Sequence, residues 1–191
     1  MKMDFVIVGV GGQGTLLTSR VLGALAGNLG VDCKVSEVHG MSQRGGSVVT
    51  YVRMGQDVAS PLVDFAQADC VLAFEQLEAL RALPYLKQGG IMIANDQRIM
   101  PMPVVIGAAQ YPDEACVALC DRENVIAMDA LALAEQAGES RSVNIVLMGA
   151  LCAHMQGDPD LWRRSIEQCV PKKFLEVNLR AFTLGYEHLM Q

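Results

Sequence analysis

The sequence lacks paired cysteines and is poor in aromatic residues, which make up 5% of the chain. Its six cysteines are scattered, and none forms the Cys-x-x-Cys pair typical of iron–sulfur clusters and zinc ribbons. The nearest approach is Cys116 and Cys120, one helical turn apart. We therefore expect ordinary buried thiols in a reducing cytosol, and neither an iron–sulfur cluster nor a metal held by this chain.

Clustered positive charge is also missing. The formal net charge is -6, and no basic stripe of the kind that binds nucleic acid or anionic membranes is present. No stretch reaches the roughly 18 apolar residues of a membrane span. The chain enters a strand directly after Asp4, without the pattern of a secretory signal. These absences predict a cytoplasmic protein with no nucleic-acid partner and no membrane.

The overall composition is typical of a globular protein. Hydrophobic residues make up 51% and charged residues 19% of 191 residues. This length suits one well-buried core and is short for two, so we expect a single domain over residues 1–191. Because aromatics are few, the 18 glycines and 11 methionines are expected to contribute to a core of small and flexible side chains.

Short apolar runs alternate with helical patterns along the chain. Strands are expected over residues 4–9, 33–38, 47–53, 69–74, 91–94, 104–108 and 125–128, and helices over 15–29, 76–86, 113–119, 143–155, 161–169 and from Lys172 onward. Residues 54–57 are typical of a hairpin turn into a strand over 58–63. The pattern predicts an α/β fold with a single doubly wound, mostly parallel, Rossmann-like sheet, a β-hairpin and a helical C-terminal third.

A glycine-rich loop follows the first expected strand and precedes a helix. It reads Gly9-Val10-Gly11-Gly12-Gln13-Gly14, which matches G-x-G-x-x-G. Such a loop brings backbone N–H groups and the positive end of a helix to an anion. The candidate ligand-binding residues are therefore Gly9, Gly11, Gly12, Gln13, Gly14 and Thr15. The alternative is that these glycines only allow the strand and the helix to pack closely.

A second loop leaves the same expected edge of the sheet. It runs from Glu37 through His39-Gly40-Met41-Ser42-Gln43-Arg44-Gly45-Gly46, and its candidate binding residues are His39, Gly40, Ser42, Gln43, Arg44, Gly45 and Gly46. Backbone donors and one guanidinium suit an anionic or acceptor group. A solvated loop with glycine turns is the alternative. His39 has no neighbouring metal ligands, so we expect it to fix loop geometry.

Together these two motifs resemble the gamma-type domain of the 2-oxoacid:ferredoxin oxidoreductases. The segment from His39 to Val48 is similar to the indolepyruvate-type version of this domain. The resemblance continues through Ser142-Val143-Asn144 and ends with Pro171 and the stretch from Asn178 to Gly185, so it spans essentially the whole chain.

The resemblance implies a heteromeric enzyme that oxidatively decarboxylates 2-oxoacids. In this family thiamine diphosphate carries the decarboxylation, coenzyme A receives the acyl group, and iron–sulfur clusters pass electrons to ferredoxin. A large partner subunit is expected to hold the thiamine diphosphate and the [4Fe-4S] clusters. This chain would help to form the coenzyme A or substrate face, with the backbone of Gly11 to Thr15 receiving a phosphate or carboxylate beside Arg44. We assign no catalytic residue to it.

Two other functions stay open. Glu37 stands where a ribose-binding acid belongs in nucleotide dehydrogenases, which favours a free-standing NAD- or FAD-binding protein; the missing substrate lobe counts against it. The third possibility is a purely architectural subunit with an empty glycine loop.

Asn144 could cap its helix or face the ligand. The isolated chain is expected to be inactive, and a homodimer is expected when the partner is absent.

Overall fold

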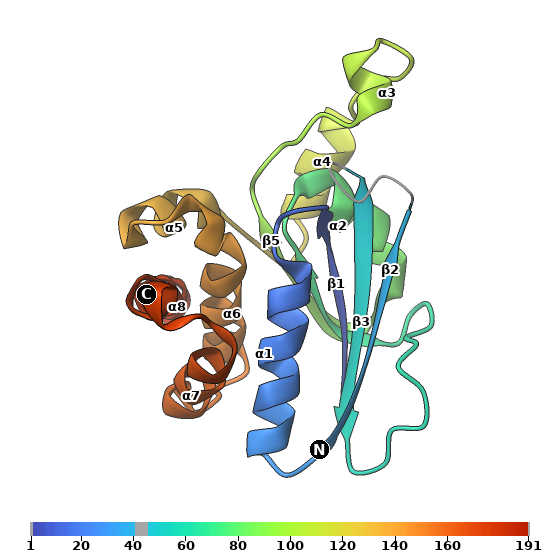
Figure 1. The fold of residues 1–191 in the computed structure, drawn as a ribbon. Coiled ribbons are helices and arrows are strands. Elements are labelled where there is room, and N and C mark those ends of the chain that lie inside the picture. The colour runs from blue at the N-terminus through green and yellow to red at the C-terminus, as the bar shows by residue number, and fades with distance from the viewer. Residues whose placement is uncertain (1, 41–45, 191) are drawn as a thin grey trace.

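The computed structural model describes residues 2–40 and 46–190. Its strands are β1 (Met3–Val10), β2 (Asp32–His39), β3 (Ser47–Gly55), β4 (Ala68–Ala73), β5 (Leu86–Asn95) and β6 (Val125–Met128). Its helices are α1 (Thr15–Asn28), α2 (Gln76–Ala82), α3 (Met102–Val105), α4 (Asp113–Cys120), α5 (Ala130–Ala137), α6 (Val143–His154), α7 (Pro159–Cys169) and α8 (Lys172–Met190), with short 3-10 helices η1 (Leu83–Tyr85) and η2 (Ser140–Ser142). The strands form one sheet in the order β2-β3-β1-β4-β5-β6 (Figure 1).

The expected doubly wound, mostly parallel α/β sheet is confirmed, and so is the helical C-terminal third. Strands β1, β4, β5 and β6 pair in parallel, whereas β3 is antiparallel to both β1 and β2. Strand β3 therefore lies between β1 and β2, although it follows both in the chain. In this register Val10 pairs with Ser47, and His39 pairs with Val48. The ends of β1 and β2 and the beginning of β3 consequently share one rim of the sheet.

The predicted hairpin from residues 54–57 into a strand over 58–63 is wrong. The hairpin of this sheet is instead formed by β2 and β3, and residues 58–63 run as an irregular segment after β3. Strand β3 already has a partner on each side, so it offers no open edge to a further strand. The guanidinium of Arg53 donates hydrogen bonds to the carbonyls of Ser60 and Leu62, which holds the segment beside the sheet.

The predicted strand over residues 104–108 is also wrong. Val104 and Val105 instead end α3, which begins after Pro101 and has Pro103 in its first turn, and turn residues follow. Proline is favoured in a first helical turn, and it cannot donate to a β-ladder. The place beside β5 is taken by β6. The apolar side chains of Val105 and Ile106 are therefore exposed, at 65% and 68%, rather than buried in the sheet.

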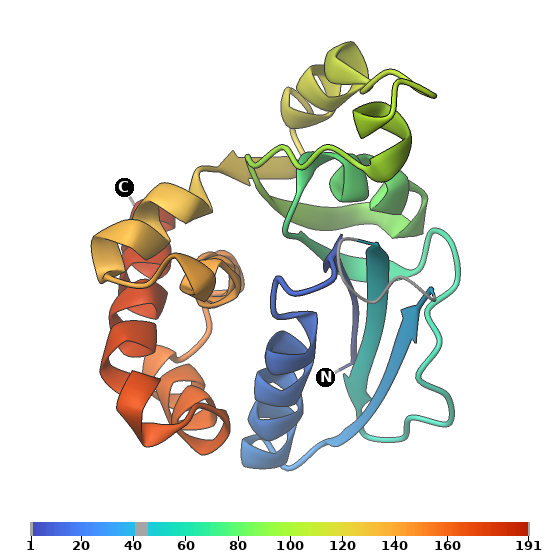
Figure 2. The ribbon, with the colours of Figure 1, turned by 45° about the horizontal axis from the view of Figure 1, so that its top comes forward.

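The two faces of the sheet are covered by different helices. Phe5 and Ile7 of β1 belong to the core that includes residues of α1, α6 and α8, while the alternate residues Val6 and Val8 pack in the core that includes residues of α2 and α4. Figures 1 and 2 both place α7 and α8 beyond α1 and α6, on the far side from the sheet. Helix α6 is thereby enclosed, and every residue of it from Val143 to Ala153 is buried.

Helices α6 and α8 touch through their backbones at two glycines. A Cβ atom at Gly149 would overlap the carbonyl of Phe182, and one at Gly185 would overlap the carbonyl of Val146. Only glycine permits so close an approach.

Within residues 2–40 and 46–190, no helix has the length and apolar character needed to cross a membrane.

Candidate functional site

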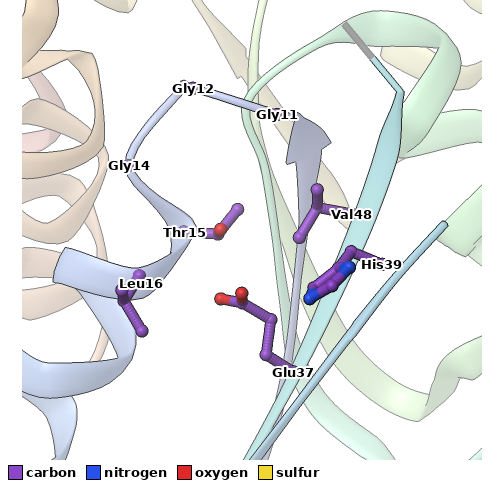
Figure 3. A pocket seen from close by; sticks show the side chains of 8 residues that line it. All are labelled: Gly11, Gly12, Gly14, Thr15, Leu16, Glu37, His39 and Val48. Carbon is purple, nitrogen blue, oxygen red and sulfur yellow. The ribbon is translucent and has the colours of Figure 1, made fainter. Parts of the chain in front are cut away.

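A pocket of about 310 Å³ opens at the shared rim of β1, β2 and β3. Its lining comes from both sides of a gap between the first turn of α1 and the β2–β3 hairpin, as Figure 3 shows. The lining residues are Gly11, Gly12, Gly14, Thr15, Leu16, Glu37, His39 and Val48. We call this cavity the rim pocket. It joins residues of the glycine-rich loop with residues of the strand that leads into the second loop.

The glycine-rich loop has the shape that its glycines allow. Gly14 precedes α1 with a φ of 92°, and a Cβ atom there would lie 2.7 Å from the amide nitrogen of Asn144. Gly9, at the end of β1, lies so close to Phe74 that a Cβ atom would be 3.2 Å from that side chain. Both positions therefore require glycine, one mainly for backbone conformation and one for close packing.

The N-terminus of α1 directs backbone N–H groups to the rim pocket, and no acceptor for those of Thr15 and Leu16 lies within the described residues. No side chain caps this helix in the part of the chain that the structure describes. The N–H groups of a first helical turn have no acceptor within the helix, and the helix dipole adds partial positive charge. The carbonyl of Gly14 is occupied, because it accepts hydrogen bonds from the backbone and hydroxyl of Thr18. The arrangement suits an anion at Thr15 and Leu16.

A backbone hydrogen bond joins the two loops. The N–H of Gly11 donates to the carbonyl of Gly46 at 2.9 Å. This bond fixes the distance between the glycine-rich loop and the beginning of β3. It also engages the N–H of Gly11, so Gly11 lines the rim pocket without offering that donor to a ligand. Backbone donors for an anion can consequently come from Gly12, Gly14 and the first turn of α1, but not from Gly11.

Gln13 braces the glycine-rich loop rather than lining the rim pocket. Its side-chain oxygen accepts a hydrogen bond from the N–H of Val10 at 2.7 Å. Its side-chain nitrogen donates to the carbonyl of Phe74 at 3.1 Å and lies 3.4 Å from the side-chain oxygen of Gln97. The amide therefore ties the loop to the ends of β1 and β4, so its role is structural support of the site.

Glu37 and His39 form the opposite wall of the rim pocket. They are two residues apart on β2 and thus project from the same face of the sheet. Figure 3 shows the carboxylate of Glu37 pointing toward Thr15, with the ring of His39 beside it. Both residues are exposed, and Nδ1 of His39 lies 3.3 Å from the carbonyl of Gly40. The pocket thus has a positive helix end on one wall and a carboxylate on the other.

Several of the predicted residues are not placed in the pocket. Ser42, Gln43, Arg44 and Gly45 lie outside the described residues. Gly9, Gln13, Gly40 and Gly46 are described but are not among the lining residues. Among the residues that the structure does describe, no group of three or more His, Cys, Asp or Glu side chains could hold a metal ion.

Two buried carboxylates near this rim were missed by the sequence reasoning. Glu75 is 1% exposed and caps α2, accepting from the N–H of Glu78, the N–H of Ile99 and the hydroxyl of Tyr111. Burial, together with the hydrogen bond to Glu75, raises the pKa of Tyr111 well above its usual range. The available signal was that Glu75 directly follows the strand expected over residues 69–74, at the edge of the sheet where ligands bind in such folds.

The second missed carboxylate is Glu78, which is 3% exposed. It lies one helical turn after Glu75 and accepts a hydrogen bond from the hydroxyl of Ser47 at 2.5 Å. Leu16 was also missed. It is half-exposed, at 48%, and lines the rim pocket from the first turn of α1.

Comparison with known proteins identifies the class to which this fold and loop pair belong. The chain matches the family described as Pyruvate ferredoxin/flavodoxin oxidoreductase over residues 4–188, and it belongs to that family. It is a subunit of an oxidoreductase of this class, as the resemblance in the sequence implied.

The curated relatives show which members of this family the chain resembles in sequence. The Indolepyruvate oxidoreductase subunit IorB of Thermococcus kodakarensis is 43% identical over 191 residues, which cover 96% of this chain and 94% of the relative. The protein of the same name from Archaeoglobus fulgidus is 37% identical, with coverage of 97% and 94%. The match is thus nearly complete on both sides.

Solved structures share the fold. The gamma subunit of a keto/oxoacid ferredoxin oxidoreductase from Geobacter sulfurreducens superposes with a TM-score of 0.72 at 22% identity, covering 98% of each chain. A 2-oxoglutarate:ferredoxin oxidoreductase from Magnetococcus marinus gives a TM-score of 0.73 at 19% identity. That match covers 99% of this chain but 31% of the other, so the same fold occurs there within a much longer chain.

Proposed function

We propose that this chain forms the coenzyme A-binding face of an indolepyruvate-type 2-oxoacid:ferredoxin oxidoreductase, with a phosphate group of coenzyme A in the rim pocket. The single observation that carries the proposal is the N-terminus of α1, which has no side-chain cap among residues 2–40 and 46–190 and opens into a pocket walled by the β2–β3 hairpin. The names of the curated relatives support indolepyruvate as the substrate of the assembled enzyme. The relative from Magnetococcus marinus was solved with coenzyme A bound, which supports the ligand.

In this proposal the chain supplies binding and orientation. The N–H groups of the first turn of α1 hold a phosphate, and Arg44 adds a guanidinium from the second loop. Glu37 on the opposite wall repels phosphate and accepts hydrogen bonds from hydroxyl or amide groups, so the phosphate lies on the α1 side. A large partner subunit carries thiamine diphosphate and the [4Fe-4S] clusters, which supply decarboxylation and electron transfer to ferredoxin when they are bound.

A charge placed at Leu16 tests the proposal. Leu16→Glu puts a carboxylate at the mouth of the rim pocket, and acidic residues in a first helical turn do not weaken the helix. Repulsion of about 1.5 kcal/mol raises the KM for coenzyme A roughly tenfold. Leu16→Gln is the matched control, because glutamine has almost the same shape as the introduced glutamate but carries no charge.

The assay uses the assembled complex with a 2-oxoacid, coenzyme A and a viologen dye as electron acceptor. We expect the KM for coenzyme A to rise in Leu16→Glu and to change less than about twofold in Leu16→Gln. Arg44→Ala is also expected to raise the KM for coenzyme A in the same assay. An unchanged KM for coenzyme A in both Leu16→Glu and Arg44→Ala overturns the proposal.

A second candidate function rests on Glu37. A carboxylate at the end of a strand beside a glycine-rich loop is the arrangement that binds the ribose hydroxyls of NAD or FAD, and Glu37 lines the rim pocket. Calorimetric titration separates the two functions. Clear binding of NADH by the isolated chain favours the dinucleotide, whereas binding of coenzyme A by the complex without NADH binding favours the first proposal.

A further inference from the structure

Glu78 is a buried carboxylate that lies outside the rim pocket. Its side chain is 4% exposed, and removing a charged carboxylate from water is unfavourable unless it is well paired. One of its oxygens accepts from Arg81 at 2.6 Å, at the surface of α2. The other accepts from the hydroxyl of Ser47 at 2.5 Å. The second contact is long-range in sequence and leads directly to the candidate site.

Three consecutive residues connect Glu78 to the rim pocket. The carbonyl of Gly46 accepts the N–H of Gly11 from the glycine-rich loop. Ser47 is held by Glu78, and Val48 lines the pocket. The position of Ser47 therefore sets the direction of the Gly46 carbonyl, and through it the placement of Gly11. Ser47 also pairs with Val10 in the β1–β3 ladder, and because it is exposed, the hydrogen bond to Glu78 adds a side-chain restraint to that backbone pairing.

Helix α2 is a firm support for this contact. Its first turn is capped by Glu75, which is nearly fully buried and also holds the N–H of Ile99 and the hydroxyl of Tyr111. Glu78 lies in this first turn, and its own N–H donates to the carboxylate of Glu75. The Ser47–Glu78 hydrogen bond thus fastens the beginning of β3 to an element that is anchored independently.

We propose that Glu78 is a positioning residue for the rim pocket, acting through Ser47 and Gly46 on the glycine-rich loop. The inference rests on the proposed function, because it takes coenzyme A as the ligand. Loss of the Ser47–Glu78 bond loosens the contact between Gly46 and Gly11, and the fraction of molecules with a binding-competent loop falls. The apparent dissociation constant rises in inverse proportion to that fraction.

The test measures the KM for coenzyme A, the KM for the 2-oxoacid and the kcat of the assembled complex, because a positioning role changes the first of these and not the other two. Ser47→Ala removes a charge-assisted hydrogen bond, which corresponds to roughly a tenfold rise in the KM for coenzyme A. The KM for the 2-oxoacid and the kcat change less than about twofold, because Ser47 and Glu78 are not among the residues that line the rim pocket and act only on the placement of the glycine-rich loop. Glu78→Gln retains an acceptor for Ser47 without the charge and gives a smaller rise.

Two further variants separate positioning from general stability. Ser47→Thr keeps the hydroxyl and restores the KM for coenzyme A. Arg81→Ala removes the other partner of Glu78 and leaves the Ser47 contact, so the same KM changes less than about twofold. A merely structural role for Glu78 predicts instead that Ser47→Ala lowers the midpoint of thermal unfolding with no change in the KM for coenzyme A.

The outcomes distinguish this inference from the proposed function. A raised KM in Leu16→Glu with an unchanged KM in Ser47→Ala overturns the positioning role and leaves the ligand site standing. An unchanged KM in Leu16→Glu and Arg44→Ala overturns the ligand site and the positioning role together. Selective increases in the KM for coenzyme A in Leu16→Glu and Ser47→Ala support both.

Discussion

The side-chain nitrogen of Asn144 lies 3.3 Å from the carbonyl oxygen of Gly14 and donates a hydrogen bond to it. Asn144 is 2% exposed and stands in the first turn of α6, where it does not cap its own helix. It therefore joins the buried C-terminal helix to the loop that precedes α1. This contact answers which role Asn144 has: it supports the glycine-rich loop.

Substitution of Asn144 tests this contact. Asn144→Ala removes the hydrogen bond and the packing against Gly14, and we expect the free energy of unfolding to fall by about 1–3 kcal/mol. Urea denaturation measures the change. Asn28→Ala is the control, because Asn28 makes a comparable side-chain bond to Ser165 from an exposed position. An equal effect of the two substitutions would show that the Gly14 contact has no special weight.

The glycines at the α6–α8 contact give a second prediction. Gly149→Ala and Gly185→Ala would each force the helices apart, because the added Cβ atom meets backbone of the opposite helix. We expect a loss of about 3 kcal/mol or more in each. Gly23→Ala in α1 is the matched control. It has open space around it, so the better helix propensity of alanine should add about 0.5–1 kcal/mol. Thermal unfolding of the three variants is sufficient, and stabilisation by Gly149→Ala would contradict the close packing.

Alkaline pH offers a third prediction through Tyr51. Burial, and then the hydrogen bond to Tyr85, raises the pKa of Tyr51 to about 12. The folded state therefore favours the neutral phenol. The contribution of Tyr51 to stability is present below the ordinary tyrosine pKa of about 10 and is lost as the pH rises from there through about 12. Phenolate absorbance should show a step near pH 12 that Tyr51→Phe removes. Complete titration of all tyrosines near pH 10 would refute the shift.

Local signals in the sequence determined much of this fold correctly. The apolar run before Gly9 and the glycines after it place β1 and α1, and the helix expected from Gln76 begins there as α2 but ends at Ala82, with Pro84 in η1. The apolar segment from Val143 is the enclosed helix α6. These elements could be predicted because periodicity and breakers act over a few residues.

The errors arose where distant partners decide the structure. The position of β3 between β1 and β2 depends on pairing across the sheet. The turn residues at positions 54–57 carry no information about this pairing, so the hairpin was predicted in the wrong place. Helix α5 was missed, although Asp129 caps its beginning and Gly138 ends it in a left-handed conformation. In the site, the glycine-rich loop was identified, but Glu78 was not, because its contact with Ser47 spans 31 residues.

Hydrogen–deuterium exchange of the assembled complex, with and without coenzyme A, tests the central claim most directly. Bound phosphate should slow exchange of the amides from Gly12 to Leu17 and around Val48, and Leu16→Glu should abolish this protection at the same concentration of coenzyme A. Saturation of the complex by coenzyme A, with exchange at the first turn of α1 unchanged, would contradict the account.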